Sequence, residues 1–275
     1  MKLSKIIFSV LFFVSILVSF NSFSQTAADH IKAGKKLYAN IDFEGAISEY
    51  SKAIELDPKS DTAYELRGDS KDKRGDYTGA ISDYSMAIEI NSKDEFVFVK
   101  RANLKKIKKD FPGAISDYSS AYSVNPKYFD GIYLRALTKQ ETEDPKGALA
   151  DYSKALIISP NNANIYLKMG IIKLSLSDYN GTISDLSRAM ELNPKINAYY
   201  QRGSAKQELA DHTGAISDFD LAIERNPNDG NAYFKRGLSK SILKDRKGAR
   251  ADWQKAADLG SKEAKDLIDG LYKAK

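Results

Sequence analysis

The chain has 275 residues, of which 42% are hydrophobic and 29% are charged, and it contains no cysteine. This composition is ordinary for a folded protein, and it excludes disulfide bonds, thiolate metal sites and disorder as the default state. The net charge of +5 falls to +3 when Lys2 and Lys5 of the first 24 residues are left out. A charge this small does not indicate nucleic-acid binding.

The first 24 residues differ from the rest of the chain. A short basic start precedes an apolar run at 6–20, and Ser22 and Ser24 are small residues at the two positions that a signal peptidase reads. This order is typical of a secretory signal peptide at 1–24, so we expect a protein that is exported to the periplasm, the outer membrane or the cell exterior. The alternative is an uncleaved membrane anchor, because the apolar run is only slightly short for a membrane span. Since no cysteine follows, a lipoprotein anchor at this site is excluded.

From about residue 27 onward, one pattern recurs seven times. A small residue anchors each copy, at spacings of 34 residues with a single spacing of 33: Ala46, Ala80, Ala114, Ala148, Thr182, Ala215 and Ala249. An alanine follows seven residues after each anchor, and between the two stands a large apolar residue: Tyr50, Tyr84, Tyr118, Tyr152, Leu186, Phe219 or Trp253. Offsets of four and seven residues lie on one helical face. The period therefore predicts an array of one helical unit.

Each copy is expected to have another helix ahead of this one. The residue twelve positions before each anchor is small: Gly34, Gly68, Ala102, Ala136, Gly170, Gly203 and Gly237. A glycine inside a helix costs about 1 kcal/mol relative to alanine, so we expect the paired helix to cross closely at that point. The aspartate four residues before every anchor is predicted to cap the second helix: Asp42, Asp76, Asp110, Asp144, Asp178, Asp211 and Asp245.

This pattern of large, small, alanine, aromatic, alanine and proline positions resembles the tetratricopeptide repeat family over about residues 27–261. The resemblance implies an all-α, right-handed superhelical solenoid of seven helix-turn-helix repeats, within a repeat domain at 25–261. The repeats are expected at 27–60, 61–94, 95–128, 129–162, 163–195, 196–229 and 230–261. Residues 262–275 carry apolar residues at helical spacing and are expected to form a capping helix and tail.

Charged residues also recur at fixed positions. An acid follows each anchor by three residues: Glu49, Asp83, Asp117, Asp151, Asp185, Asp218 and Asp252. Five copies have an arginine thirteen residues before the anchor, and six have a lysine nine residues before it. The first copy has the acid but neither cation, and it has no predecessor. We therefore expect each cation to pair with the acid of the repeat before it, as in Arg101 with Asp83 and Arg135 with Asp117. The alternative is a basic track for an acidic ligand.

The chain offers no constellation of catalytic residues. Its two histidines, His30 and His212, have no metal-ligand spacing and are expected to have packing or solvent roles. There is no glycine-rich phosphate loop and no serine nucleophile elbow. Helix caps and repeat pairs account for the many carboxylates. We expect a protein that is not an enzyme and that needs neither a metal nor a cofactor.

The resemblance also implies where a partner binds. In the tetratricopeptide repeat family, the first helices of the repeats line a concave face that holds peptides. The inward positions lie fifteen and eleven residues before each anchor, and they are largely apolar in the last four copies. They predict a groove that binds a protein or peptide at Val99, Asn103, Tyr133, Leu137, Leu167, Ile171, Tyr200, Ser204, Phe234 and Leu238. The alternative is that these side chains pack against neighbouring repeats. Another column, Asn164, Asn197 and Asn231, is interpreted as helix caps rather than as peptide ligands.

The sequence thus predicts an exported, non-enzymatic scaffold or adaptor of the cell envelope that binds a partner segment in its concave groove. The alternative is a membrane-anchored assembly factor that organises a complex by self-association. A nucleic-acid partner is not expected, and a membrane is expected only through an uncleaved N-terminal segment. The sequence identifies neither the partner nor the oligomeric state.

Overall fold

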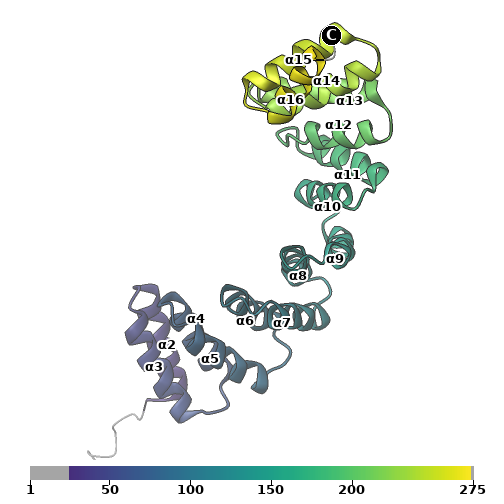
Figure 1. Ribbon diagram of the computed structural model, residues 1–275. Helices are drawn as coiled ribbons and strands as arrows, with labels where there is room; N and C mark the ends of the chain where they lie inside the picture. Colours follow the sequence, from purple (N-terminus) through teal and green to yellow (C-terminus); the bar gives the residue numbers. More distant parts are fainter. Residues whose placement is uncertain (1–24, 274–275) are drawn as a thin grey trace, which may run out of the picture. The chain divides into compact units, whose positions relative to one another are not determined.

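A computed structural model describes residues 25–273, with side chains to residue 270. The predicted signal peptide at 1–24 lies outside this part of the chain. The described residues form fifteen helices and no strand (Figure 1). None of these fifteen helices is both long enough and apolar enough to cross a membrane.

The chain divides into two compact units, unit 1 at Met1–Tyr128 and unit 2 at Phe129–Lys275. The described part of unit 1 has three helix pairs: α2 (Ala27–Ala39) with α3 (Phe43–Leu56), α4 (Asp61–Lys73) with α5 (Tyr77–Ile90), and α6 (Glu95–Ile107) with α7 (Phe111–Val124). That of unit 2 has four pairs and a last helix: α8 (Phe129–Glu141) with α9 (Pro145–Ile158), α10 (Ala163–Ser175) with α11 (Tyr179–Leu192), α12 (Tyr199–Glu208) with α13 (His212–Arg225), α14 (Gly230–Ile242) with α15 (Arg246–Asp258), and α16 (Lys262–Lys273). The helices pack in consecutive pairs, which confirms the predicted all-α repeat solenoid.

The two helices of a pair cross closely where a small residue of the first meets a large residue of the second. A Cβ atom on Gly34 would lie 2.5 Å from Cε1 of Tyr50, and one on Gly68 would lie 2.7 Å from Cε1 of Tyr84. Both tyrosines are fully buried. The close crossing is therefore confirmed, and it explains why a residue that weakens a helix is used there.

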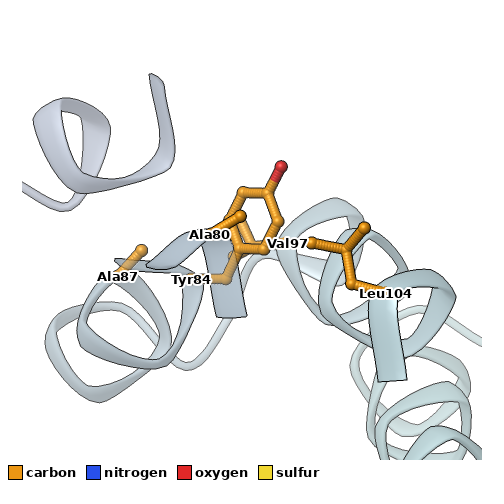
Figure 2. Close-up of a cluster of buried hydrophobic side chains, with 5 residues drawn as sticks. All are labelled: Ala80, Tyr84, Ala87, Val97 and Leu104. Carbon is orange, nitrogen blue, oxygen red and sulfur yellow. The ribbon is translucent and has the colours of Figure 1, made fainter. Parts of the chain in front are cut away.

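Figure 2 shows how one of these rings joins neighbouring repeats of unit 1. Tyr84 stands between Ala80 and Ala87 on α5, and it shares a buried cluster with Val97 and Leu104 of α6. The stripe of small and large residues thus contacts the next repeat as well as its own partner helix. Successive repeats of a solenoid share a core in this way, because a single helix pair is too small to bury its apolar face alone.

The last helix, α16, covers the end of unit 2. Its Ala264 and Ile268 are buried in one cluster with Ala249, Trp253 and Ala256 of α15. This packing shields the apolar stripe of the seventh repeat, which has no successor in the described chain. The contact is that of the predicted capping helix.

The seven aspartates predicted as caps do cap the second helices. In every copy the aspartate Oδ1 accepts a hydrogen bond from the backbone N–H three residues later, at 2.9–3.0 Å. That third residue is always a glycine: Gly45, Gly79, Gly113, Gly147, Gly181, Gly214 and Gly248. A Cβ atom at any of these glycines would overlap Oδ2 of the cap. The glycine column, which the sequence interpretation passed over, leaves room for the capping carboxylate in its observed orientation.

The asparagine column is not a set of caps, so that interpretation is wrong. Asn162 caps α10, and its Oδ1 accepts hydrogen bonds from the N–H groups of Asn164 and Ile165. Asp229 caps α14, and α12 begins without a side-chain cap after Ala198. Asn164 and Asn231 lie two residues after the caps, inside the first turn of their helices.

The pairing of the charged columns also differs from the prediction, because each acid pairs within its own repeat. Asp83 is bound by Arg67 and Lys71, and Asp117 by Arg101 and Lys105. The same holds in unit 2 for Arg135 and Lys139 with Asp151, Lys173 with Asp185, Arg202 and Lys206 with Asp218, and Arg236 and Lys240 with Asp252. The N···O distances are 2.5–2.9 Å. The predicted pairs Arg101 with Asp83 and Arg135 with Asp117 are therefore wrong, and so is a basic track for a ligand.

The register of the helix pair explains this result. The crossing places the residue twelve before the anchor opposite the residue four after it. The arginine lies one residue before that small residue and the lysine three residues after it. The two cations are therefore four residues apart on one helical face, one on each side of the acid. In the first repeat, Nδ1 of His30 lies 2.6 Å from Oε2 of Glu49, so a histidine takes the place of the missing cations. The predicted packing role of His30 is thus that of a buried partner for an acid.

The arginines do link repeats, but through a different atom. While Nε and Nη2 hold the acid, Nη1 of Arg67 donates to Oγ of Ser51, and Nη1 of Arg101 donates to Oγ of Ser85. In unit 2, Nη1 of Arg202 donates to Ser187. Each acceptor lies in the repeat before, two residues after its acid. One guanidinium therefore closes its own helix pair and fastens that pair to the preceding one.

The residue before each capping aspartate has a left-handed backbone conformation. The seven residues have φ of 58–81°: Ile41, Gly75, Lys109, Glu143, Ser177, Ala210 and Lys244. At Ile41 the next N–H, of Asp42, reaches back to the carbonyl of Leu37, which is the helix-ending pattern that favours glycine. Only the second repeat has glycine at this position.

We predict that Ile41→Gly raises the free energy of unfolding of unit 1 by about 1 kcal/mol, because glycine adopts the left-handed conformation without steric cost. Its side chain is 75% exposed, so little packing is lost. The matched substitution Gly75→Ala should lower it by about the same amount. Urea denaturation followed by circular dichroism measures both, and a destabilised Ile41→Gly protein would contradict the interpretation.

The ion pairs predict a strong coupling between Arg101 and Asp117. Because Asp117 is buried, removing either partner should cost about 3 kcal/mol, and the double alanine variant should cost about 1–3 kcal/mol less than the sum of the two. A parallel cycle between Arg101 and Asp83 should give a smaller coupling energy. Equilibrium unfolding of the four proteins in each cycle tests this, and a larger coupling to Asp83 would restore pairing between repeats.

Candidate partner-binding site

Unit 2 carries most of the predicted groove residues, on the first helices of its pairs. Six of them are half-buried: Tyr133, Leu137, Leu167, Tyr200, Phe234 and Leu238. Ile171 on α10 is 41% exposed, whereas Ser204 on α12 is buried. Seven of these eight side chains thus retain surface that a partner can contact, and Ser204 retains little.

The inner sides of these residues pack on the core. Leu167 packs against the cluster of Leu186 and Met190, and Phe234 and Leu238 pack against that of Trp253. For these three side chains, the packed side faces mainly the second helix of their own repeat. The other side stays open, which gives a face of partly exposed apolar groups held by a rigid core.

Two tyrosines give this face polar edges. The Tyr133 ring stacks on Phe129 at 5.1 Å between centroids, and the Tyr200 ring lies 6.0 Å from that of Phe219. Burial raises the pKa of both phenols above the ordinary value of 10. The hydroxyls therefore stay neutral near pH 7 and can donate hydrogen bonds to a bound chain.

Unit 1 has a hollow of about 340 Å³, and unit 2 has one of about 450 Å³. The hollow in unit 2 is lined by the apolar residues Leu238, Ile242, Trp253 and Leu267 and by polar residues, His212 among them. Only Leu238 of this set was predicted from the sequence. The others come from α14, α15 and α16. The sequence analysis had Trp253 in the stripe of large residues and expected apolar residues in the capping helix, but both patterns predict packing rather than a pocket.

The corresponding face of unit 1 is polar. Val99 is buried, and Asn103 is exposed with its Oδ1 accepting a hydrogen bond from the Tyr118 hydroxyl at 2.6 Å. The preceding repeat has acids at the equivalent positions, and Nζ of Lys100 lies 2.7 Å from Glu65 and 2.8 Å from Asp69. Of the two residues predicted here, Asn103 alone offers surface.

The two acids on this face of unit 1, Glu65 and Asp69, are neutralised by Lys100. Burial lowers the pKa of Lys100, but its hydrogen bonds to Asp69 and Glu65 outweigh this and raise the pKa above its ordinary value. Asp69 also accepts a hydrogen bond from the Tyr84 hydroxyl at 2.8 Å. Sequence reasoning missed Lys100, whose position, fourteen residues before the anchor, was not among the inspected columns. The hollow in unit 1 is lined by this satisfied network, so the apolar face is a property of unit 2.

The comparisons with known proteins agree with this architecture. Residues 34–71 match a family model described as TPR repeat, and residues 196–229 match one described as Tetratricopeptide repeat. The chain belongs to the tetratricopeptide repeat (TPR) family. No curated protein matches its sequence significantly.

Solved TPR structures share the fold. The C-terminal part of a TPR repeat-containing protein from Cytophaga hutchinsonii has a TM-score of 0.68 at 19% identity, covering 88% of this chain and 99% of that one. YrrB, described as a TPR protein with an unusual peptide-binding site, has 0.61 at 23% identity, covering 68% and 97%. A TPR protein from Parabacteroides merdae has 0.55 at 20% identity, covering 90% and 97%. At these identities the likeness shows the fold alone.

The TPR array contains no candidate metal centre within its described residues, where no group of three or more histidine and acidic side chains is placed to hold an ion. The carboxylates that recur through the array are engaged in caps and in ion pairs with arginine, lysine or His30. The TPR fold is that of a protein-protein interaction scaffold. The chemistry that the site offers is apolar contact with hydrogen bonds at its edges.

Proposed function

We propose that this TPR protein is a non-enzymatic adaptor that holds a segment of a partner protein against the apolar face of unit 2. The observation that carries the proposal is the series of partly exposed apolar side chains on successive first helices, from Leu167 and Ile171 through Tyr200 to Phe234. Covering such a face is favourable by roughly 25 cal/mol per Å² of apolar surface removed from water. Tyrosine and phenylalanine are the residues that most often anchor such contacts.

The hollow between α14 and α16 extends this face with a pocket for one large side chain. Its volume of about 450 Å³ exceeds that of any single amino-acid side chain, and Leu238, Ile242, Trp253 and Leu267 give it apolar contacts. Glu208 and Lys235 at its edge carry opposite charges, so the pocket favours an uncharged anchor. The partner segment that fits best is therefore an extended or helical stretch with large apolar residues.

Two further points support the proposal. The solved structure of YrrB, with the same fold, is described as having a peptide-binding site. On the corresponding face of unit 1, Lys100 pairs with Glu65 and Asp69, and Asp69 accepts a hydrogen bond from the Tyr84 hydroxyl, so that face is polar where the face of unit 2 is apolar.

We further propose that the protein acts in the cell envelope after removal of residues 1–24. The basic start, the apolar run and the small residues before Gln25 support this location. Sequencing the N-terminus of the mature protein from fractionated cells tests it, and Gln25 is the expected first residue. An intact N-terminus in the membrane fraction would favour the anchored assembly factor instead.

The groove proposal predicts that Ile171→Ser with Tyr200→Ser weakens the binding of peptides selected on the native protein from a random displayed library. Losing two apolar anchors should raise the dissociation constant at least tenfold, since each tenfold change corresponds to about 1.4 kcal/mol. The selected peptides should be rich in large apolar residues. Fluorescence anisotropy with synthetic labelled peptides measures the effect.

Ile157→Ser is the matched control for that experiment. Ile157 is 80% exposed on α9, a second helix, so the substitution removes an exposed apolar side chain away from the predicted groove. Its peptide affinity should equal that of the native chain, and circular dichroism should show equal helicity in all variants. Equal weakening by Ile157→Ser, or none by the groove variant, would place binding on another face.

A further inference from the structure

One joint of unit 2 lacks the arginine that fastens neighbouring repeats. Arg202 and Arg236 each hold the acid of their own pair and reach back to the preceding repeat, to Ser187 at 2.9 Å and to Asp220 at 2.6 Å. In the fifth repeat the equivalent residue is Met169 on α10, which is buried and cannot donate a hydrogen bond. The joint between α9 and α10, called here the α9/α10 joint, therefore lacks this bond.

Ser153 and Asp185, which an arginine at position 169 would bind, are more exposed than the equivalent serines and the acids that bind an arginine. Ser153 on α9 is exposed, whereas the equivalent serines Ser51, Ser85 and Ser187 are half-buried beneath an arginine. Asp185, the acid of the fifth repeat, is held by Lys173 alone. Its side chain is 11% exposed, against 1–6% for the acids that also bind an arginine. The two groups that an arginine at position 169 would bind are thus both more open to water than these counterparts.

Packing at the α9/α10 joint is also the sparsest between consecutive helices of unit 2. Position 157 on α9 carries an isoleucine where five of the other six repeats carry an acid, and this side chain is 80% exposed. A bond between exposed atoms, from Arg188 to Asn161 at 3.3 Å, links the fifth repeat to the preceding loop. Sparse packing and exposed bonds are the physical marks of a segment that opens at low free-energy cost.

We propose that the α9/α10 joint is a hinge, at which the fourth repeat rotates against the fifth to seventh repeats. Motion of this kind, between rigid bodies that each keep their own core, is hinge motion. The hinge lies within the series of groove residues, between Tyr133 and Leu137 on α8 and Leu167 and Ile171 on α10. If the groove binds as proposed above, the hinge adjusts the spacing between its two parts, and this consequence alone rests on the proposed function.

Spin-label distances in the full chain test the hinge directly, because the chain has no cysteine to compete for the label. Lys146, Asn180 and Thr213 are exposed and are each the second residue of their helices, α9, α11 and α13. The double variant Lys146→Cys with Asn180→Cys spans the α9/α10 joint. The matched pair Asn180→Cys with Thr213→Cys spans the next joint, which has its arginine.

The expected result is a distance distribution at least twice as broad for the first pair as for the second. Adding Met169→Arg, which supplies a donor for Ser153 and Asp185, should narrow the first distribution, and Arg202→Met should broaden the second. Equal widths in the two native-sequence backgrounds would overturn the hinge, whether or not the Met169→Arg protein folds. A first distribution that Met169→Arg leaves unchanged in a folded protein would overturn the assigned cause.

Measurements with a bound peptide distinguish the hinge itself from its proposed effect on the groove. A peptide selected on the native protein should narrow the distribution of the first pair and leave that of the second unchanged. If the two widths differ without peptide but no peptide alters them, the hinge stands and the groove across it is refuted. If no peptide binds at all, the proposed function fails while the spin-label comparison still decides the hinge.

Discussion

The structure depends on one steric contact, the crossing of a small residue in each first helix with a large buried residue in the second. At Gly34 and Gly68 there is no room for a Cβ atom, so the distance between the two helix axes is set by the backbone of one and the ring of the other. A contact this close also fixes the register, because a shift by one residue would bring a side chain into the ring. The position of every other paired group follows from that register, including the acid between its two cations and the outward-facing residues of the groove.

Much of this could be predicted from the sequence, because the repeated positions report steric and capping requirements that act locally. The spacing of the alanines gives the helical stripe, the glycines give the crossing, and Asp42 with its counterparts gives the start of each second helix. The pairing of the charges could not be predicted in the same way. The lack of cations in the first copy has two explanations, a missing neighbour or a substitute partner, and His30 was interpreted as a departure from an aromatic position. Only the register distinguishes the two, and the register is a relation between helices.

The sequence predicted which positions form the candidate site, but not how deeply each side chain is buried. Counting back from the anchors identifies the side of the helix, yet it does not tell how far the neighbouring helix covers that side. Val99 and Ser204 stand at the right positions and are buried, while Ile171 is open. The pocket formed with Trp253 and Leu267 depends on how the capping helix lies against the last pair. Lys100 was missed for a similar reason, since its partners belong to the preceding repeat and no column of a single repeat contains them.

The pairing of the acid three residues after each anchor within its own repeat has an evolutionary consequence. Had the acids been paired across repeats, losing or duplicating one repeat would leave a buried charge without its partner at the new junction, at a cost of several kcal/mol. With the pair contained in one helix-turn-helix, a complete unit can be gained, lost or exchanged and its charges remain compensated. What changes at a new junction is a set of contacts with partial access to water, such as the bond of Arg101 to Ser85 and the pair of Lys100 with Glu65. A whole unit can therefore be added to or removed from the array without a compensating substitution in these acids.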